Sequence, residues 1–151
     1  GRNDIITSKV AMGSTAVWFY AQTKDALTPH TGGNWMLLFI DADCDATTGW
    51  CGYDFLVNRH IADAKTTTLM RYSRYAPREP WVRVATLDYR YSGNELELAI
   101  PRKLLGLIGN AVTFDFHWCD NPSDLKDAIS LCVNGDSAPN RRFNYRCVWR
   151  R

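Results

Sequence analysis

Three aspartates stand at alternate positions directly after an apolar run, in the segment Asp41-Ala42-Asp43-Cys44-Asp45. Ionised carboxylates this close together repel one another, and a hard cation bound by several oxygen atoms relieves the repulsion. Calcium is the usual occupant of such acidic loops. Asp41, Asp43 and Asp45 are therefore predicted ligands of a structural calcium ion.

The same segment departs from the EF-hand pattern. Ala46 stands where that loop needs a glycine, and Gly52 stands where it needs a bidentate glutamate. The alternative interpretation is a solvated acidic turn whose aspartates accept hydrogen bonds from backbone N–H groups. The residues alone leave both interpretations open.

Aromatic residues are abundant, with six Trp, seven Tyr and six Phe. Aromatic rings stack on the apolar C–H faces of sugars, and a few polar side chains beside them orient the ligand. Trp50 and Trp81 lie next to turn residues, while Asn58 and Arg59 follow a strand-like segment and offer donors to hydroxyl groups. We predict these four as carbohydrate-binding residues. The alternatives are core packing for the tryptophans and an ordinary turn for Asn58 and Arg59.

Motifs of catalysis are missing from the sequence. It contains no Gly-x-Ser-x-Gly, no His-Glu-x-x-His, no phosphate-binding loop and no dinucleotide fingerprint. Two of its glutamates, Glu95 and Glu97, lie on the same face of one predicted strand, so a glycosidase pair is hard to build from glutamates. We expect a protein that is not an enzyme.

The elements that must position these residues are mainly strands. Apolar and polar residues alternate with period two over 94–100, 112–118 and 143–149, with Phe143, Tyr145, Cys147 and Trp149 expected on one side of the last segment. The unbroken apolar run 35–40 predicts a central strand buried on both faces. Only 101–108 and 123–129 look helical. The predicted fold class is all-β, an antiparallel β-sandwich of immunoglobulin-like type with one or two short helices.

Charge and cysteine content restrict the partners and the compartment. The 18 Lys and Arg against 16 Asp and Glu leave a net charge of +2, which predicts no nucleic-acid partner, and no apolar run is long enough for a membrane span. The odd number of cysteines allows at most two disulfides; the alternative is five reduced thiols. The pairing of Cys44, Cys51, Cys119, Cys132 and Cys147 stays open.

Several segments together resemble a known family. Residues 18–24, 34–43 and 48–55, the last reading Thr-Gly-Trp-Cys-Gly-Tyr-Asp-Phe, look like the DOMON-like β-sandwich modules related to family 9 carbohydrate-binding modules. The resemblance continues through 94–101 and 135–145. It implies a DOMON-like fold, a secreted or cell-surface location, and a single module over 1–151 that is the terminal part of a longer protein such as a glycoside hydrolase.

The resemblance also implies specific ligands. Asp54 joins Asp41, Asp43 and Asp45 as a calcium candidate, and Trp50, Trp81 and Arg59 are the sugar candidates. This chain departs from the family at Cys51, where such modules usually carry an acid.

The predicted function is non-catalytic binding of a polysaccharide or oligosaccharide, which targets an attached catalytic domain to its substrate. The alternative is a structural accessory module that packs against that catalytic domain and has no ligand of its own. A haem-binding electron-transfer module draws on the same broad fold and needs an axial pair such as His with Met, but Met36 lies in a predicted core strand and Met70 has no signalled histidine partner.

Overall fold

The computed structural model describes all residues, 1–151, and its regular structure is almost entirely antiparallel β. One 3₁₀ turn (Arg102–Leu105) and one helical turn, α1 (Ser130–Val133), are the only helical elements. The predicted all-β class is confirmed. The strands are β1 (Ile5–Met12), β2 (Ala16–Thr23), β3 (Leu37–Asp41), β4 (Phe55–Ile61), β5 (Thr66–Tyr72), β6 (Trp81–Ser92), β7 (Glu95–Pro101), β8 (Ala111–Asp120), β9 (Asp136–Ala138) and β10 (Tyr145–Arg150).

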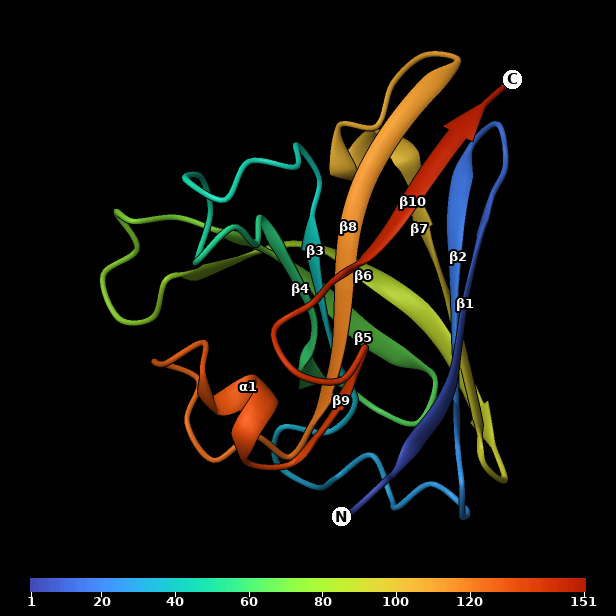
Figure 1. Ribbon diagram of the computed structural model, residues 1–151, viewed down its shortest axis with the longest axis vertical. Coiled ribbons are helices and arrows are strands. Elements are labelled where there is room, and N and C mark those ends of the chain that lie inside the picture. Colours follow the sequence, from blue (N-terminus) through green and yellow to red (C-terminus); the bar gives the residue numbers. More distant parts are fainter.

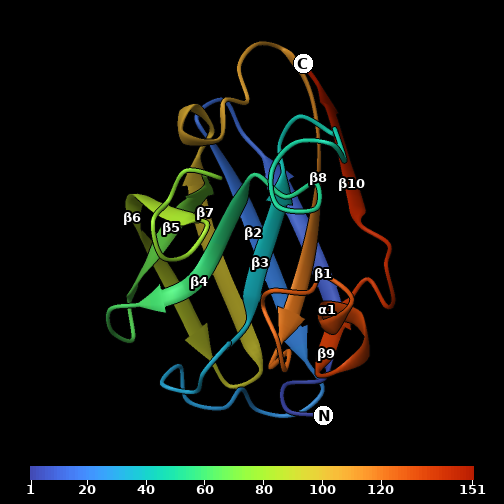
Figure 2. The same ribbon diagram turned by 90° about the vertical axis from the view of Figure 1, so that its left-hand side faces the viewer.

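The strands form one strongly curled sheet in the order β1-β2-β7-β6-β5-β4-β3-β8-β10, and β9 pairs with β8. The long strand β6 serves both halves of this sheet. Its first part, 81–88, pairs with β5, and its last part, 89–92, pairs with β7. The curl therefore produces two layers, with β3 and β4 in front of β2 and β7 in Figure 2. We call β1, β2, β7 and the end of β6 the first layer, and the remaining strands the second layer.

The main core lies between the two layers. On β2, Val17, Phe19 and Ala21 are buried in it, whereas Trp18 points outward. The alternation predicted for β7 is confirmed, because its leucines and Ile100 enter the core while its glutamates stay exposed. Aromatic edges meet inside the core, for example Phe19 against rings of β8. Burial of these apolar side chains is the main favourable contribution to the free energy of folding.

Strand β3 is buried on both faces, as the apolar run predicted. Leu38 and Ile40 enter the main core, whereas Leu37 and Phe39 enter a second, smaller apolar cluster on the outer side of the second layer. Residues from two long segments complete this outer cluster, namely Tyr53 from 42–54 and Leu131 from 121–134. In Figure 1 both segments lie on the left, outside β3, β4 and β8.

Three details of the expected local structure are wrong. Residues 123–129 form bends and turns, because Asp124 and Asp127 accept hydrogen bonds from backbone N–H groups two residues on, which competes with a helix. The helix expected over 101–108 shrinks to the 3₁₀ turn, which ends at Gly106 with a left-handed φ of 70°. Phe143 precedes β10 and is 70% exposed, so it does not share the half-buried face of that strand.

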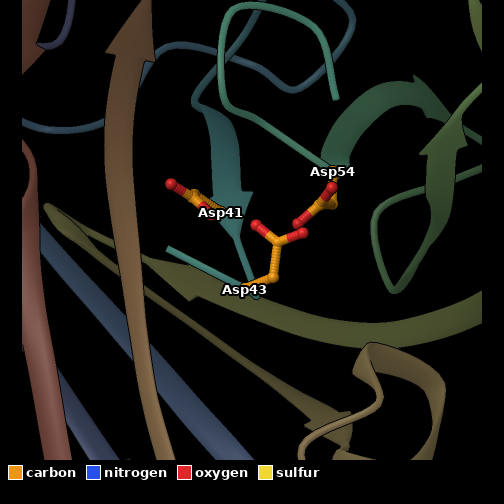
Figure 3. A group of neighbouring side chains, drawn as sticks. All are labelled: Asp41, Asp43 and Asp54. Atoms are coloured by element: carbon orange, nitrogen blue, oxygen red, sulfur yellow. The ribbon is translucent and has the colours of Figure 1, made fainter. Parts of the chain in front are cut away.

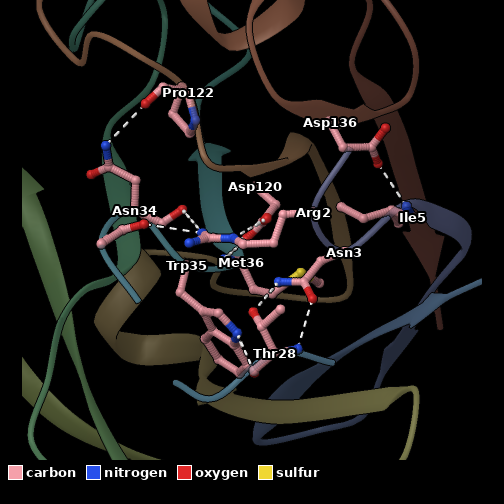
Figure 4. Close-up of polar contacts among 11 residues, drawn as sticks. Arg2, Asn3, Ile5, Thr28, Asn34, Trp35, Met36, Asp120, Pro122 and Asp136 are labelled. Atoms are coloured by element: carbon pink, nitrogen blue, oxygen red, sulfur yellow. Dashed lines mark hydrogen bonds and ion pairs between the residues drawn. The ribbon is translucent and has the colours of Figure 1, made fainter. Parts of the chain in front are cut away.

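An ion pair between the partly exposed Arg2 and the buried Asp120 connects the N-terminal segment to the end of β8 (Figure 4). The guanidinium of Arg2 donates to both oxygens of Asp120, at 2.9 and 3.0 Å. The backbone N–H of Met36 donates to the same carboxylate at 2.8 Å. Met36 has a left-handed φ of 42°, which is costly for a residue other than glycine, and this bond helps to hold it.

Neither helical segment has the length or the apolar composition to cross a lipid bilayer.

Because the Asp120 carboxylate bonds both Arg2 and Met36, its removal should lower the free energy of unfolding. We expect Asp120→Ala to lower the free energy of unfolding by about 3–5 kcal/mol, because it leaves the Arg2 charge and the Met36 N–H without their partner. Urea denaturation followed by tryptophan fluorescence measures this change. Asp88→Ala, at an exposed position of β6, is the control and should change the free energy by less than about 0.5 kcal/mol. Equal effects of the two substitutions would contradict the assigned role.

Candidate functional site

Three of the four predicted metal ligands meet at one end of β3. Asp41 ends the strand, Asp43 follows in the loop, and Asp54 directly precedes β4. One carboxylate oxygen from each lies within 4.8 Å of the others. Figure 3 shows the carboxylates of Asp43 and Asp54 facing each other, with Asp41 beside them. We call these residues the aspartate cluster.

The intervening loop must fold back on itself to bring Asp54 to Asp43. Trp50 and Tyr53 form an isolated β-bridge that closes this turn, and Gly49 has a left-handed φ of 63°. A Cβ atom at Gly49 would lie only 2.3 Å from the carbonyl oxygen of Tyr53, so the tight approach requires glycine.

Asp45 lies outside the aspartate cluster. It is exposed, and its carboxylate accepts hydrogen bonds from the backbone N–H and the hydroxyl of Thr47. These bonds hold the pKa of Asp45 below its ordinary value. Asp43 is also exposed, and its carboxylate accepts hydrogen bonds from the backbone N–H of Asp45 and the hydroxyl of Thr48. The acidic turn that was the alternative interpretation of the sequence is therefore present at both residues.

Asp41 and Asp54, the two less exposed members of the aspartate cluster, have pKa values that are raised, in contrast to that of Asp45. Asp41 is only 6% exposed, and burial raises its pKa to about 6. Burial also raises the pKa of Asp54. The neighbouring carboxylate of Asp115 is neutralised by a two-pronged ion pair with Arg146, but none of the ion pairs in the structure includes a member of the cluster.

The aspartate cluster therefore fits a hard divalent cation. Carboxylate oxygens are the ligands that calcium and magnesium prefer, and Oδ1 of Asp41 is buried without a hydrogen-bond partner. Backbone and water oxygens complete such coordination spheres, so three carboxylates do not by themselves select calcium over magnesium.

The two predicted sugar-binding tryptophans belong to one aromatic group on the outer side of the second layer. Trp50 is partly exposed and stacks on Phe39, with ring centroids 5.8 Å apart. Trp81 meets Trp50 edge to face at 6.2 Å and is only 6% exposed. The segment 42–54 thus contains Trp50, and the ring of Trp50 packs against that of Trp81.

Asn58 and Arg59 have different surroundings although they are adjacent on β4. Asn58 is buried with a left-handed φ of 67°, and its side-chain amide donates to the carbonyl of Met36 at 2.7 Å. Arg59 is partly exposed and donates to Glu79 at 3.2 Å and to the side-chain oxygen of Asn34 at 3.4 Å. The structure therefore gives the Asn58 amide a partner within the protein and leaves Arg59 at the surface.

Arg59 and Trp81 line the same surface recess, which has a volume of about 280 Å³. His60 also bonds Glu79, at 3.0 Å, and the hydrogen bonds from His60 and Arg59 hold the pKa of Glu79 below its ordinary value. The recess thus has a guanidinium and a carboxylate that hold each other, and the largely buried Trp81 contributes only a small exposed part of its ring. Its lining residues are Asn34, Arg59, Arg78, Glu79, Pro80, Trp81, Ser123, Asp124, Leu125 and Lys126.

Asn34, Glu79 and Lys126 are not among the residues predicted from the sequence to form the site. They come from three separate connections, and no local pattern signals that these meet beside β4. The sequence did place Glu79 next to Pro80 and Trp81, which was the available hint.

His117 was expected on the polar side of β8 and is instead buried under the outer segments. Its Nδ1 contacts the carbonyl of Phe143 at 3.0 Å, while its Nε2 has no hydrogen-bond partner. Burial lowers its pKa below the ordinary value, which favours the neutral ring.

The five cysteines carry free thiols in the structure. Cys119 is buried and its Sγ contacts the carbonyl of Leu131 at 3.3 Å, and burial raises the pKa of this thiol. Cys44 and Cys51, which both lie in the segment 42–54, are not joined.

Comparison of the chain with family models, curated proteins and solved structures finds no match. The resemblance to DOMON-like and family 9 carbohydrate-binding modules stays a prediction.

The raised pKa of Asp41 predicts a pH dependence of stability in metal-free buffer. The folded protein retains a proton on Asp41 up to about pH 6, whereas the unfolded chain releases it near the ordinary value of 3.8. Between these values the folded state binds more protons, so this residue makes the free energy of unfolding decrease as pH rises from about 4 to about 6.

The comparison variant is Asp41→Asn, which cannot titrate at this position. Urea denaturation at several pH values should show that the wild type loses stability relative to the variant across this interval. If the free energies of unfolding of the two proteins change with pH in the same way, the raised pKa of the buried Asp41 is contradicted.

Proposed function

We propose that this chain is a non-catalytic carbohydrate-binding module with a structural divalent cation in the aspartate cluster. The observation that carries the proposal is the recess, where Arg59 and Trp81, selected from two distant parts of the sequence, lie together beside Glu79. The recess is mainly polar, and side chains with fixed donors and acceptors beside an apolar residue can orient a ligand that carries hydroxyl groups.

The polar groups of the recess suit hydroxyl recognition. Arg59 supplies N–H donors and Glu79 supplies acceptor oxygens, and each already holds the other in place. A side chain held before binding loses less conformational entropy on binding, which favours affinity. One sugar unit is the occupant that matches a recess of about 280 Å³.

The cation acts on this site indirectly in our proposal. Asp41, Asp43 and Asp54 would hold the ion, and the ion would replace the repulsion between them by attraction. Trp50 lies in the loop that these residues close, and it packs against Trp81. A bound cation therefore stabilises the loop that supports the recess, and no chemical step passes through it.

The proposal also specifies the ligand class, the partner and the location of the protein. A polysaccharide is the ligand, an attached catalytic domain is the partner in the same chain, and the location is outside the cytoplasm. The alternative, a structural module packed against that domain, predicts that no polysaccharide retains the isolated chain.

The recess is tested by Arg59→Ala. In affinity gel electrophoresis with xylan, β-glucan, galactomannan and starch, we expect the wild type to be retarded by at least one polymer. Loss of the guanidinium should weaken that binding by about tenfold, which is the effect of a typical important contact. Arg150→Ala, on the exposed side of β10, is the matched control and should bind normally. Normal binding by Arg59→Ala would remove the recess from the proposal.

The cation site is tested by thermal unfolding with and without calcium or magnesium. We expect an added cation to raise the melting temperature of the wild type by several degrees, because it binds only the folded state. Asp41→Asn and Asp54→Asn should abolish the increase, whereas Asp45→Asn should retain it, since Asp45 lies outside the cluster. An increase that survives in Asp41→Asn, or no increase in the wild type, would contradict the site.

A further inference from the structure

The outward face of the first layer carries a second set of aromatic and polar side chains, remote from the recess. The strand register places Lys9, Tyr20, Glu97 and Arg90 in one row across β1, β2, β7 and β6. Trp18 stands in the next row, two residues from Tyr20 on β2. We call these five residues the platform.

Trp18 is the most exposed of the six tryptophans. It is 46% exposed, and its neighbours in the register are Ala11 and Ala99, whose side chains are too short to cover an indole. The ring lies against Gly13, where a Cβ atom would come within 2.7 Å of it. Glycine and alanine thus let the indole rest on the sheet surface with solvent beside it.

A trough of about 900 Å³ is lined by three platform residues, Tyr20, Glu97 and Arg90, and Trp18 stands outside it in the next row of the sheet. Glu97 and Arg90 are opposite each other on β7 and β6, yet their side chains form no hydrogen bond or ion pair with any residue. Tyr20 instead bonds Glu95, a neighbour of Glu97 on the same strand. The trough therefore has free acceptors and free donors side by side.

The charges around the trough nearly cancel. Asp88, Glu95 and Glu97 are acidic, and Lys65 and Arg90 are basic, with Lys9 placed over the Tyr20 ring at 5.0 Å. A polyanion or a polycation would meet as much repulsion as attraction here. A neutral ligand with many hydroxyl groups can use donors and acceptors of both kinds.

From these observations we infer that the platform is a second binding surface for a neutral polysaccharide, with Trp18 as the stacking ring and Glu97 and Arg90 as the hydroxyl-binding groups. The inference rests on the proposed function, because it concerns the same class of ligand. In Figure 1, β2 and β7 lie on the right, whereas the segment around α1 beside the recess lies on the left. Two surfaces on opposite layers would let one module contact two polymer chains, which strengthens retention by avidity.

The test uses the same electrophoresis with xylan, β-glucan, galactomannan and starch, and adds polygalacturonate as an acidic probe. We expect Trp18→Ala to weaken binding of a neutral polymer by about tenfold. Glu97→Gln and Arg90→Ala should each weaken it less, and these exposed positions keep the fold intact. Phe143→Ala is the matched control, since Phe143 is an exposed aromatic residue outside both surfaces.

The binding of the variants and of the acidic probe distinguishes the platform from the alternatives. Weaker binding by Trp18→Ala and by either polar variant, with normal binding by Phe143→Ala, supports the platform. Unchanged binding by Trp18→Ala, Glu97→Gln and Arg90→Ala overturns the platform but leaves the proposed function standing if Arg59→Ala is impaired. Binding of polygalacturonate alone, abolished by salt, overturns the inference of a neutral ligand. Absence of any retardation of the wild type overturns both proposals.

Discussion

The structure depends on one constraint, which is that strand β3 is apolar on both faces. A single opposing layer buries only Leu38 and Ile40, so Leu37 and Phe39 need a second cover. Apolar side chains left in water would cost much of the small net stability of a domain of this size. The segments 42–54 and 121–134 provide the cover, and the recess and the aspartate cluster lie in or beside them. The candidate site is thus a consequence of how the outer face of β3 is closed.

Much of the β architecture could be predicted because it depends on local periodicity. The alternation of β7 and the unbroken run of β3 follow from which faces are buried, and both are present in the structure. The helix expected over 123–129 is absent. The side chains of Asp124 and Asp127 accept hydrogen bonds from nearby backbone N–H groups, and these bonds stabilise turns in place of a helix. The predicted position of Phe143 on the half-buried face is wrong because alternation does not show where a strand begins, and β10 begins only at Tyr145.

The candidate site was only partly predictable, for a related physical reason. Asp41 and Asp43 are close in sequence, so their proximity could be inferred, but the position of Asp45 outside the cluster depends on how the loop turns. The contact of Arg59 with Glu79 depends on how two loops pack over the sheet, which residue spacing does not encode. Residue types identified the chemistry, and tertiary packing determined which of these residues became neighbours.

The shared strand β6 has a further consequence, for the way the molecule unfolds. Residues 81–88 pair in one layer and 89–92 in the other, so one continuous strand connects the two layers and they cannot move apart independently. The ion pair between Arg2, which precedes β1, and Asp120, which ends β8, connects the two layers at a second place. Partial opening would expose the common core, so the chain is built to lose its structure in a single cooperative transition, with amides of the central strands exchanging only through global unfolding.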